Sequence, residues 1–205
     1  METKEREFRN FTVSEIRAAT AEDGQKKISG YAAVFNELSD DLGGFKEKVA
    51  PGAFTATLEK DDIRSLWNHN SDYPLGRVKA RTLSVSQDLR GLKFEINPPD
   101  TQYARDLLVS IERGDVNQMS FSFFTDDDNW ENVNGVYIRT LLAVTLLEVS
   151  PVTFPAYPQT SAVVRSKIAE LNQADQAVDP EASVKAAAQV RAAIRKRNLQ
   201  ILNYR

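Results

Sequence analysis

The feature that most constrains the fold is the run Leu141–Leu147 (LLAVTLL), which is apolar at almost every position. A strand in an open antiparallel sheet with one wet side would alternate between apolar and polar residues. An extended run with two apolar faces fits a central strand that has helices on one face and a barrel interior on the other. We therefore expect a closed or nearly closed β-barrel with surrounding helices.

Shorter stretches with alternating apolar residues predict further strands in the first 165 residues. Leu92, Phe94 and Ile96 repeat with a period of two, which is typical of half-buried strands. Many short strands and few helices indicate a β-rich α+β fold. The predicted strands are Phe11–Ala18, Ile28–Phe35, Ile63–Trp67, Leu83–Gln87, Leu92–Ile96, Gln118–Phe124 and Val136–Val149.

Two helices are predicted between these strands. A short one follows Pro51 and extends to about Glu59, and a longer one begins after Thr101 and ends at Gly114. Its apolar residues recur at helical spacing. They are Tyr103, Ala104, Leu107, Leu108 and Ile111.

The last 40 residues differ in kind from the rest of the chain. Strand signals stop after Val164, and residues 182–205 contain no Asp or Glu but several Lys and Arg. We expect residues 1–165 to form one β-barrel domain and residues 166–205 to form a linker and a basic amphipathic helical tail. Within this tail, Asn172–Pro180 is polar and is predicted to be a loosely structured linker.

Composition excludes several classes of function. The formal net charge is −3, so nothing global indicates binding to nucleic acid, and no apolar run approaches the ~20 residues of a membrane span. The chain has no Cys, which removes disulfides, thiolate catalysis and Cys-based zinc sites. We expect no cofactor, no metal, no membrane association and a cytoplasmic setting.

One histidine, His69, is the only imidazole that could act as a general base. It lies in the polar sequence Asn68-His69-Asn70, directly after the apolar residues Leu66 and Trp67. A lone histidine is more often structural than catalytic. If the chain is an enzyme of the nucleophile-plus-imidazole kind, however, the base must be His69 and the nucleophile must be Ser or Thr.

Two serines and one carboxylate are candidate partners of His69. In Met119-Ser120-Phe121-Ser122-Phe123, both serines share one strand face if Met119 and the phenylalanines point to the core. Glu148 follows the apolar run and either marks the exposed end of that strand or orients an imidazole. Residues 126–135, with three Asp residues, three Asn residues and Gly135, are expected to form a solvated hairpin loop.

Several segments taken together resemble the prohead (capsid maturation) proteases of tailed bacteriophages, of the HK97 type. The resemblance covers roughly residues 8–165 and depends on the order and separation of the segments. They are Gly30–Asn36, Gly43–Glu47, Ala50–Phe54, Asn68–Asn70, Pro74–Gly76, Met119–Phe123 and Glu148–Tyr157.

The resemblance implies a fold related to the herpesvirus maturation proteases, a β-barrel ringed by helices. It implies a serine endopeptidase that cleaves the scaffolding segment of phage capsid proteins, and itself, inside the immature prohead in the cytoplasm of the bacterial host. The family's catalytic positions fall on His69, Ser120 and Glu148. The implied partners are the major capsid protein and its scaffolding segment, and whether the chain forms a homo-oligomer stays open.

The position of Glu148 conflicts with the simplest strand pairing. If strands Gln118–Phe124 and Val136–Val149 formed a hairpin around Trp130, Ser120 would lie opposite about Leu141 and Glu148 would lie further along. A bend, a bulge or a different strand pairing is required to bring Glu148 to Ser120. Asp72 and Asp115 therefore remain alternatives for the third position.

Two other functions stay open. One is a non-catalytic capsid assembly or scaffolding protein that retains the protease fold. The other is a small-molecule esterase or amidase, although the chain lacks the Gly-x-Ser-x-Gly nucleophile elbow of many such enzymes. The basic tail is predicted to dock the protein onto the growing shell, and the Asn172–Pro180 linker is a candidate site of self-cleavage.

Overall fold

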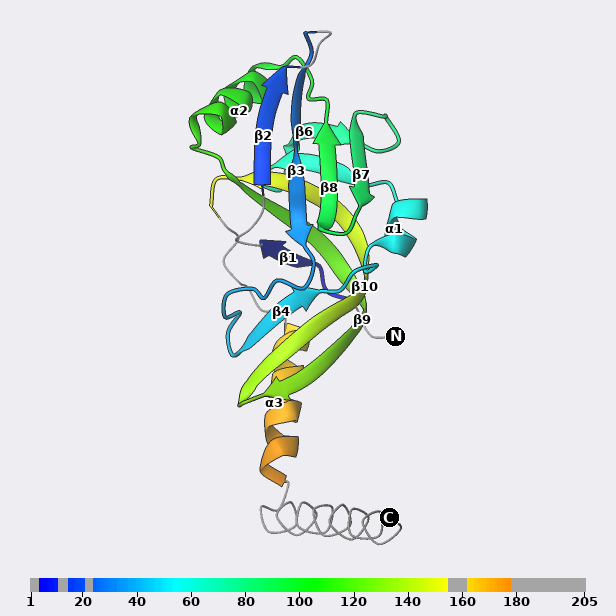
Figure 1. Ribbon diagram of the computed structural model, residues 1–205, viewed down its shortest axis with the longest axis vertical. Coiled ribbons are helices and arrows are strands. Elements are labelled where there is room, and N and C mark those ends of the chain that lie inside the picture. The colour runs from blue at the N-terminus through cyan, green and yellow to red at the C-terminus, as the bar shows by residue number, and fades with distance from the viewer. Residues whose placement is uncertain (1–3, 11–14, 21–23, 155–161, 178–205) are drawn as a thin grey trace, which may run out of the picture. The chain divides into compact units, whose positions relative to one another are not determined.

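The structure is a computed structural model that describes residues 4–10, 15–20, 24–154 and 162–177. The chain divides into two compact units, residues 1–161 and residues 162–205. The described residues of the first unit form ten strands and two helices, and those of the second unit form a single helix (Figure 1). Each unit is described by itself.

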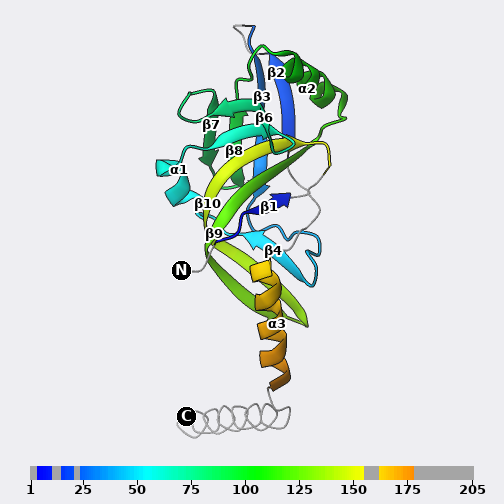
Figure 2. The same ribbon diagram turned by 180° about the vertical axis from the view of Figure 1, so that it is seen from behind.

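The larger sheet of the first unit is built around the two longest strands, which lie side by side (Figure 1). Its strands run in the order β1-β9-β10-β5-β6, and β4 pairs with β10 through a different part of that strand. Seen from behind, β1 runs beside β9 (Figure 2). The strands are β1 (Glu7–Asn10), β4 (Phe45–Val49), β5 (Arg64–Trp67), β6 (Asn70–Arg77), β9 (Gln118–Val133) and β10 (Val136–Val152).

The smaller sheet has four antiparallel strands in the order β2-β3-β8-β7. They are β2 (Glu15–Thr20), β3 (Lys26–Val34), β7 (Leu83–Gln87) and β8 (Gly91–Ile96). One cluster of buried apolar side chains draws on both sheets, with Phe94 from β8 and Phe121 from β9 among its fully buried members. The two sheets therefore share one core.

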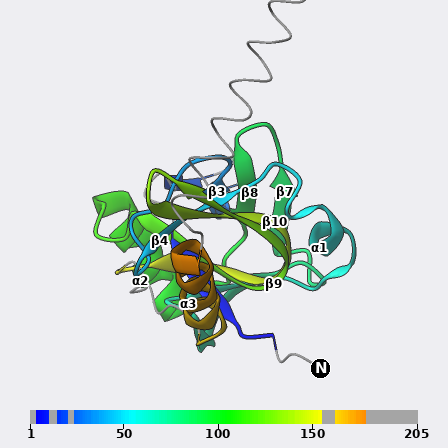
Figure 3. The same ribbon diagram turned by 90° about the horizontal axis from the view of Figure 1, so that it is seen from below.

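Two helices complete this unit and lie on opposite sides of it (Figure 3). They are α1 (Thr55–Lys60) and α2 (Gln102–Arg113). The apolar face of α2 is buried through Ala104, Leu107, Leu108 and Ile111, as the helical spacing predicted. Gly114 ends the helix in the left-handed conformation (φ 83°), which glycine adopts without steric cost.

The β-rich α+β class is confirmed, but the closed barrel is not found. In the described ranges, the strand pairings form two sheets, and no pairing closes either sheet on itself. The run Leu141–Leu147 is also less buried than expected. Leu141, Val144 and Leu146 lie in the core, whereas Leu142 on the other face is 41% exposed. The prediction that both faces of this strand are buried, which came from its apolar composition, was therefore wrong.

Several predicted boundaries also differ from the structure. The strands β1, β4 and β6 were not predicted, and the predicted strand Phe11–Ala18 corresponds to β2, which begins at Glu15; residues 11–14 lie outside the described residues. Edge strands such as β6 are mostly exposed and polar, so they lack the alternation that identifies a strand.

The predicted hairpin loop over residues 126–135 is wrong, because β9 continues to Val133. The turn is only Asn134-Gly135, and both residues have positive φ (54° and 85°), as a two-residue type I′ turn requires. The acidic residues 126–128 lie within β9, where Asp126 contacts Lys4 and the Thr145 hydroxyl and Asp128 contacts Arg139. Because the turn lies at Asn134 and not at Trp130 as expected, every residue of β9 pairs with a different residue of β10 than predicted.

The second unit is described through one helix, α3 (Ala162–Ala177). The predicted loose linker Asn172–Pro180 is wrong in its first half, because residues 172–177 belong to α3. Polar composition alone did not distinguish an exposed helix from a linker. The predicted basic helix over residues 182–205 lies outside the described residues.

Candidate active site

His69 lies at the tip of the hairpin that joins β5 and β6. Trp67 pairs with Asn70, so Asn68 and His69 are the two central residues of the turn. Both have positive φ (53° and 58°), the geometry of a type I′ turn. This turn usually takes glycine at its second central position, so His69 occupies a backbone conformation that is unfavourable for most residues. The imidazole is 17% exposed and lies against β9 and β10.

Asn68 ties this hairpin tip to the end of β10. Its backbone N–H donates to the Pro151 carbonyl at 3.0 Å. Its side-chain Oδ1 accepts from the Thr153 N–H at 2.8 Å, and its Nδ2 donates to the Thr153 hydroxyl at 3.3 Å. The strand that carries Glu148 and the turn that carries His69 are therefore held at a fixed distance.

Strand β9 brings both candidate serines to the same face of the sheet. Met119, Phe121 and Phe123 lie in the core, as the alternation predicted, and Ser120 and Ser122 are fully buried on the opposite side. Their partners differ. Ser120 Oγ lies 2.8 Å from His69 Nε2, whereas Ser122 Oγ accepts from the Arg6 guanidinium at 2.8 Å and 3.1 Å.

A β-bulge in β10 brings Glu148 to the same face. Leu146 pairs with Phe123, but Glu148 pairs with Ser122 and Ser150 pairs with Ser120, so two steps in β10 correspond to one in β9. Side chains alternate along a strand, so the extra residue reverses which face the following residues occupy. Leu146 thus points to the core and Glu148 points to the serines. The different strand pairing set by the turn at Asn134-Gly135 accounts for most of the displacement that the sequence could not explain, and the bulge adds one residue and turns Glu148 to the face of the serines.

The Glu148 carboxylate is 2% exposed and has several partners. One oxygen, Oε1, bonds to His69 Nδ1 and accepts from Arg6 Nη2 at 3.0 Å, and the other, Oε2, accepts from the Ser150 hydroxyl. Burial alone would raise the pKa of Glu148. The hydrogen bond and charge of His69, with hydrogen bonds from Ser150 and Ser122, outweigh burial and hold the pKa below its ordinary value of 4.5.

The structure thus brings together all three residues named from the sequence, Ser120, His69 and Glu148, from β9, the β5–β6 turn and β10. The two alternatives lie elsewhere. Asp72 is exposed on β6, and Asp115 pairs with Arg113 at 2.9 Å. Sequence reasoning missed Arg6 and Ser150 as partners of Glu148. Ser150 was detectable, since residues two apart on a strand share a face, but no pattern around Arg6 indicated its contact.

This arrangement is suited to proton transfer from a hydroxyl. An ionised carboxylate only accepts hydrogen bonds, so we assign the imidazole N–H to Nδ1, facing Glu148, which leaves Nε2 free to accept from Ser120. Ser120 Oγ also lies 3.1 Å from the Arg9 carbonyl oxygen on β1. Its single hydroxyl hydrogen serves either His69 or Arg9 at one time.

The opposite face of the same strands carries a second polar group, which we call the ion cluster: Glu7, Arg9, Glu47 and Arg139. Arg9 donates to Glu47 at 2.8 Å and Arg139 donates to Glu7 at 2.8 Å, with cross contacts of 2.6 Å and 3.0 Å. All four side chains are at most 5% exposed. Every charge in the ion cluster has partners of opposite sign, as buried charges require.

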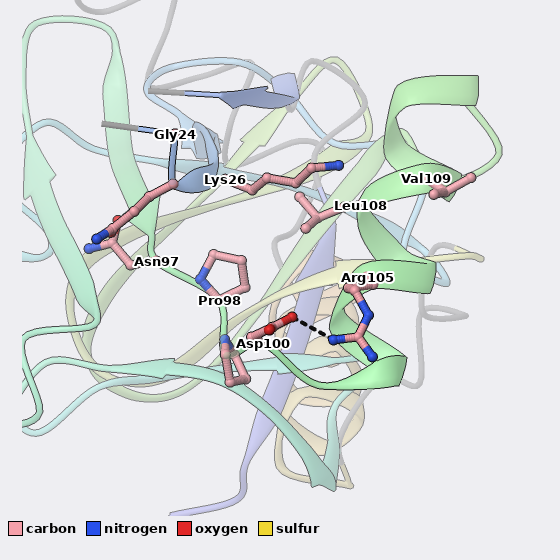
Figure 4. Close-up of a pocket in the computed structure, with 10 residues that line it drawn as sticks. Gly24, Lys26, Asn97, Pro98, Asp100, Arg105, Leu108 and Val109 are labelled. Atoms are coloured by element: carbon pink, nitrogen blue, oxygen red, sulfur yellow. Dashed lines mark hydrogen bonds and ion pairs between the residues drawn. The ribbon is translucent and has the colours of Figure 1, made fainter. Parts of the chain in front are cut away.

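A cavity of about 600 Å³ lies away from these groups (Figure 4). It is lined by the start of β3, the segment after β8 and one side of α2, and Arg105 pairs with Asp100 at its wall. None of its lining residues belongs to the His69 site. In the described ranges, no three His, Asp or Glu side chains are grouped to bind a metal ion, and no helix is long and apolar enough to span a membrane.

Comparison with known proteins identifies the family. The model of the caudovirus prohead serine protease family matches residues 12–174, which is well over half of the chain. One solved structure with a similar fold is the capsid assembly protease gp21 of bacteriophage T4, with a TM-score of 0.44 and 11% identity over 72% of this chain and 98% of that one. Curated protein sequences contain no match. The chain belongs to the caudovirus prohead serine protease family.

Proposed function

We propose that this prohead protease is a serine endopeptidase with Ser120 as nucleophile, His69 as general base and Glu148 as the group that orients the imidazole. The observation that carries the proposal is the position of His69 between the other two, with Nε2 at 2.8 Å from Ser120 Oγ and Nδ1 bonded to Glu148. Nucleophile, base and orienting carboxylate in hydrogen-bonded series are the parts of a serine protease triad.

In the proposed mechanism, Ser120 Oγ attacks the scissile carbonyl carbon as its proton moves to His69 Nε2. The imidazolium formed is stabilised by the buried Glu148 carboxylate. His69 then donates this proton to the leaving amine as the C–N bond breaks, which leaves an acyl ester on Ser120. Water, deprotonated by His69, cleaves the ester and restores the serine.

The full burial of Ser120 adds a requirement to this mechanism. Its side chain is 0% exposed, and the Arg9 carbonyl lies within hydrogen-bonding distance of its oxygen. A substrate carbonyl must reach the same oxygen, so the chain around Ser120 must move before attack. We interpret the structure as a resting form of the protease.

The proposed substrates are the scaffolding segment of the phage capsid protein and the protease itself, cleaved inside the immature shell in the host cell. Membership of a prohead protease family supports this choice. The proposed tail function, docking onto the shell, concerns residues 182–205, outside the described part of the chain.

The test is co-expression with the cognate major capsid protein, followed by intact mass measurement of both proteins. The wild-type chain is expected to remove the scaffolding segment, and Ser120→Ala is expected to leave it uncut. Ser122→Ala is the matched control, because Ser122 lies on the same face but contacts Arg6 instead of His69. It should retain substantial cleavage.

Two outcomes would contradict the proposal. Cleavage by the Ser120→Ala variant, or loss of cleavage only in Ser122→Ala, would reject Ser120 as the nucleophile. Intact capsid protein with the wild-type chain would favour the alternative of a non-catalytic assembly protein.

A further inference from the structure

Arg6 contacts the proposed active site from the N-terminal segment, just before β1. Its guanidinium donates to Glu148 Oε1 at 3.0 Å and to Ser122 Oγ at 2.8 Å, with a second contact from Nε to Ser122 at 3.1 Å. Glu148 Oε1 is the same oxygen that bonds to His69 Nδ1. Arg6 and His69 therefore share one acceptor atom.

The neighbouring Phe8 links Arg6 to the imidazole from a second direction. The Arg6 guanidinium lies over the Phe8 ring, 4.7 Å from its centroid. The Phe8 ring meets the His69 ring edge to face, with centroids 4.8 Å apart. Arg6 thus lies against a ring that itself contacts the base.

The ion cluster fixes the backbone that carries Arg6. Glu7 and Arg9, on the other face of β1, are bonded to Arg139 and Glu47. These buried contacts hold β1 in place, even though the Arg6 side chain is 41% exposed. A guanidinium on a fixed strand can hold a carboxylate in one orientation.

The polar groups around Glu148 come from four parts of the chain. Arg6 precedes β1, His69 lies in the β5–β6 turn, Ser122 is on β9 and Ser150 is on β10 itself. On the adjacent strand β5, Arg64 pairs with Asp62 at 3.5 Å. Arg6 is thus the one permanent positive charge with a contact to Glu148 in the described part of the chain.

We propose that Arg6 is a positioning residue of the active site, which orients the Glu148 carboxylate and opposes protonation of His69. This inference rests on the proposed roles of Ser120, His69 and Glu148. It assigns a function to a residue that lies before the family match at residues 12–174. A positive charge beside the carboxylate offsets part of the attraction that Glu148 exerts on an imidazolium, so removing that charge should make protonation of the imidazole easier.

The test uses His69 as its own probe, since the chain has one histidine. The ¹H NMR signal of the ring Cε1–H, followed against pH in the full-length protein, reports protonation of His69 without a substrate. Arg6→Met is expected to raise the titration midpoint by roughly 0.5 pH unit, as suits a half-exposed charge in moderate salt. Arg6→Lys, which keeps the charge, should titrate close to wild type.

Lys4→Met is the matched control, because Lys4 is also in the N-terminal segment but pairs with Asp126. The substitution removes one positive charge at a position that does not contact Glu148, so it should leave the titration midpoint of His69 unchanged. A midpoint in Arg6→Met equal to that of wild type would overturn the inference. So would an equal rise in Lys4→Met, which would mean that net charge alone is responsible.

Cleavage of purified capsid protein gives the second measurement. Arg6→Met is expected to lower the maximal rate about 3- to 30-fold and to move the acid limb of the pH–rate profile upward, whereas a purely structural role would leave that limb in place. A wild-type rate in Arg6→Met would reject the orienting role. If the wild-type protein cleaves nothing but the His69 midpoint still rises in Arg6→Met, the proposed protease function fails. The inference that Arg6 acts on His69 through Glu148 then stands.

Discussion

The two faces of strands β1, β9 and β10 each carry a buried polar group, and the groups differ in how completely their charges are paired. In the ion cluster, two carboxylates and two guanidiniums bond to one another, and each charge is permanent near neutral pH. In the His69 site, one carboxylate bonds to a titratable imidazole, a half-exposed guanidinium and hydroxyls.

This difference suits the ion cluster to stabilising the fold and the His69 site to exchanging protons. A fully paired set of charges gives up no proton and fixes the strands. A serine hydroxyl with two acceptors and an imidazole between serine and carboxylate can exchange protons with little rearrangement. Changes in the His69 site should therefore lower activity more than stability, and changes in the ion cluster should lower stability first.

The largest expected effect is on catalysis, in Glu148→Gln. The amide keeps the shape of the side chain but presents no carboxylate to His69 Nδ1, so the rate of capsid-protein cleavage should fall by roughly 10³- to 10⁴-fold. Urea unfolding should show that the variant still folds cooperatively, so that the fall in rate is not a loss of the fold. A rate within tenfold of wild type would remove Glu148 from the proposed triad.

The next effect is on stability, in Arg139→Met. This change leaves Glu7 and Glu47 buried with one cation fewer, and it should lower the free energy of unfolding by about 3–5 kcal/mol. Urea unfolding followed by tryptophan fluorescence measures it.

Lys48→Met is the control for Arg139→Met. Lys48 lies next to Glu47 on β4, but it pairs with the exposed Glu131 at 3.4 Å, so its loss should cost less than about 1 kcal/mol. Equal effects of the two substitutions would mean that burial does not set the strength of these pairs.

The smallest effect is the acid dependence of stability that Glu7 causes. Burial alone would raise the pKa of Glu7, but the hydrogen bond from Arg139 and the charges of Arg9 and Arg139 outweigh it, so the folded-state pKa lies below 4.5. The unfolded chain then binds this proton more readily than the native state. The stabilisation is complete above the unfolded-state pKa and is lost as the pH falls from about 4.5 through the lower folded-state pKa.

Urea unfolding between pH 3 and pH 7 measures this dependence. Glu7→Gln should make the free energy of unfolding fall less steeply with acid than in wild type. An unchanged slope would show that other carboxylates, among them Glu148, dominate acid unfolding.

Much of the site could be predicted because its residue types are scarce. One histidine leaves one imidazole base, and strict alternation around Ser120 predicts which residues share its face. The choice of Ser120 over Ser122 came from the family resemblance, and the contacts of the two serines agree with that choice.

The remaining features depend on contacts between distant parts of the chain. The bulge after Leu146 has no local signal, and the sequence offered a bulge only as one of several ways to bring Glu148 to Ser120. Arg6 reaches Glu148 because β1 pairs with β9, across more than one hundred residues. The turn position was predictable, since Asn134-Gly135 is a strong type I′ signal, but the acidic residues before it were interpreted as loop.

The hairpin tip that carries His69 has a consequence for protein engineering. The imidazole owes its place to the backbone of a two-residue turn and to the clamp between Asn68 and Thr153. A designer who transplanted Ser120, His69 and Glu148 as isolated side chains onto another scaffold would lose that placement. The smallest transferable module is the whole β5–β6 hairpin together with the bulged end of β10 and the part of β9 that carries Ser120, because the position of His69 depends on chain direction and loop length.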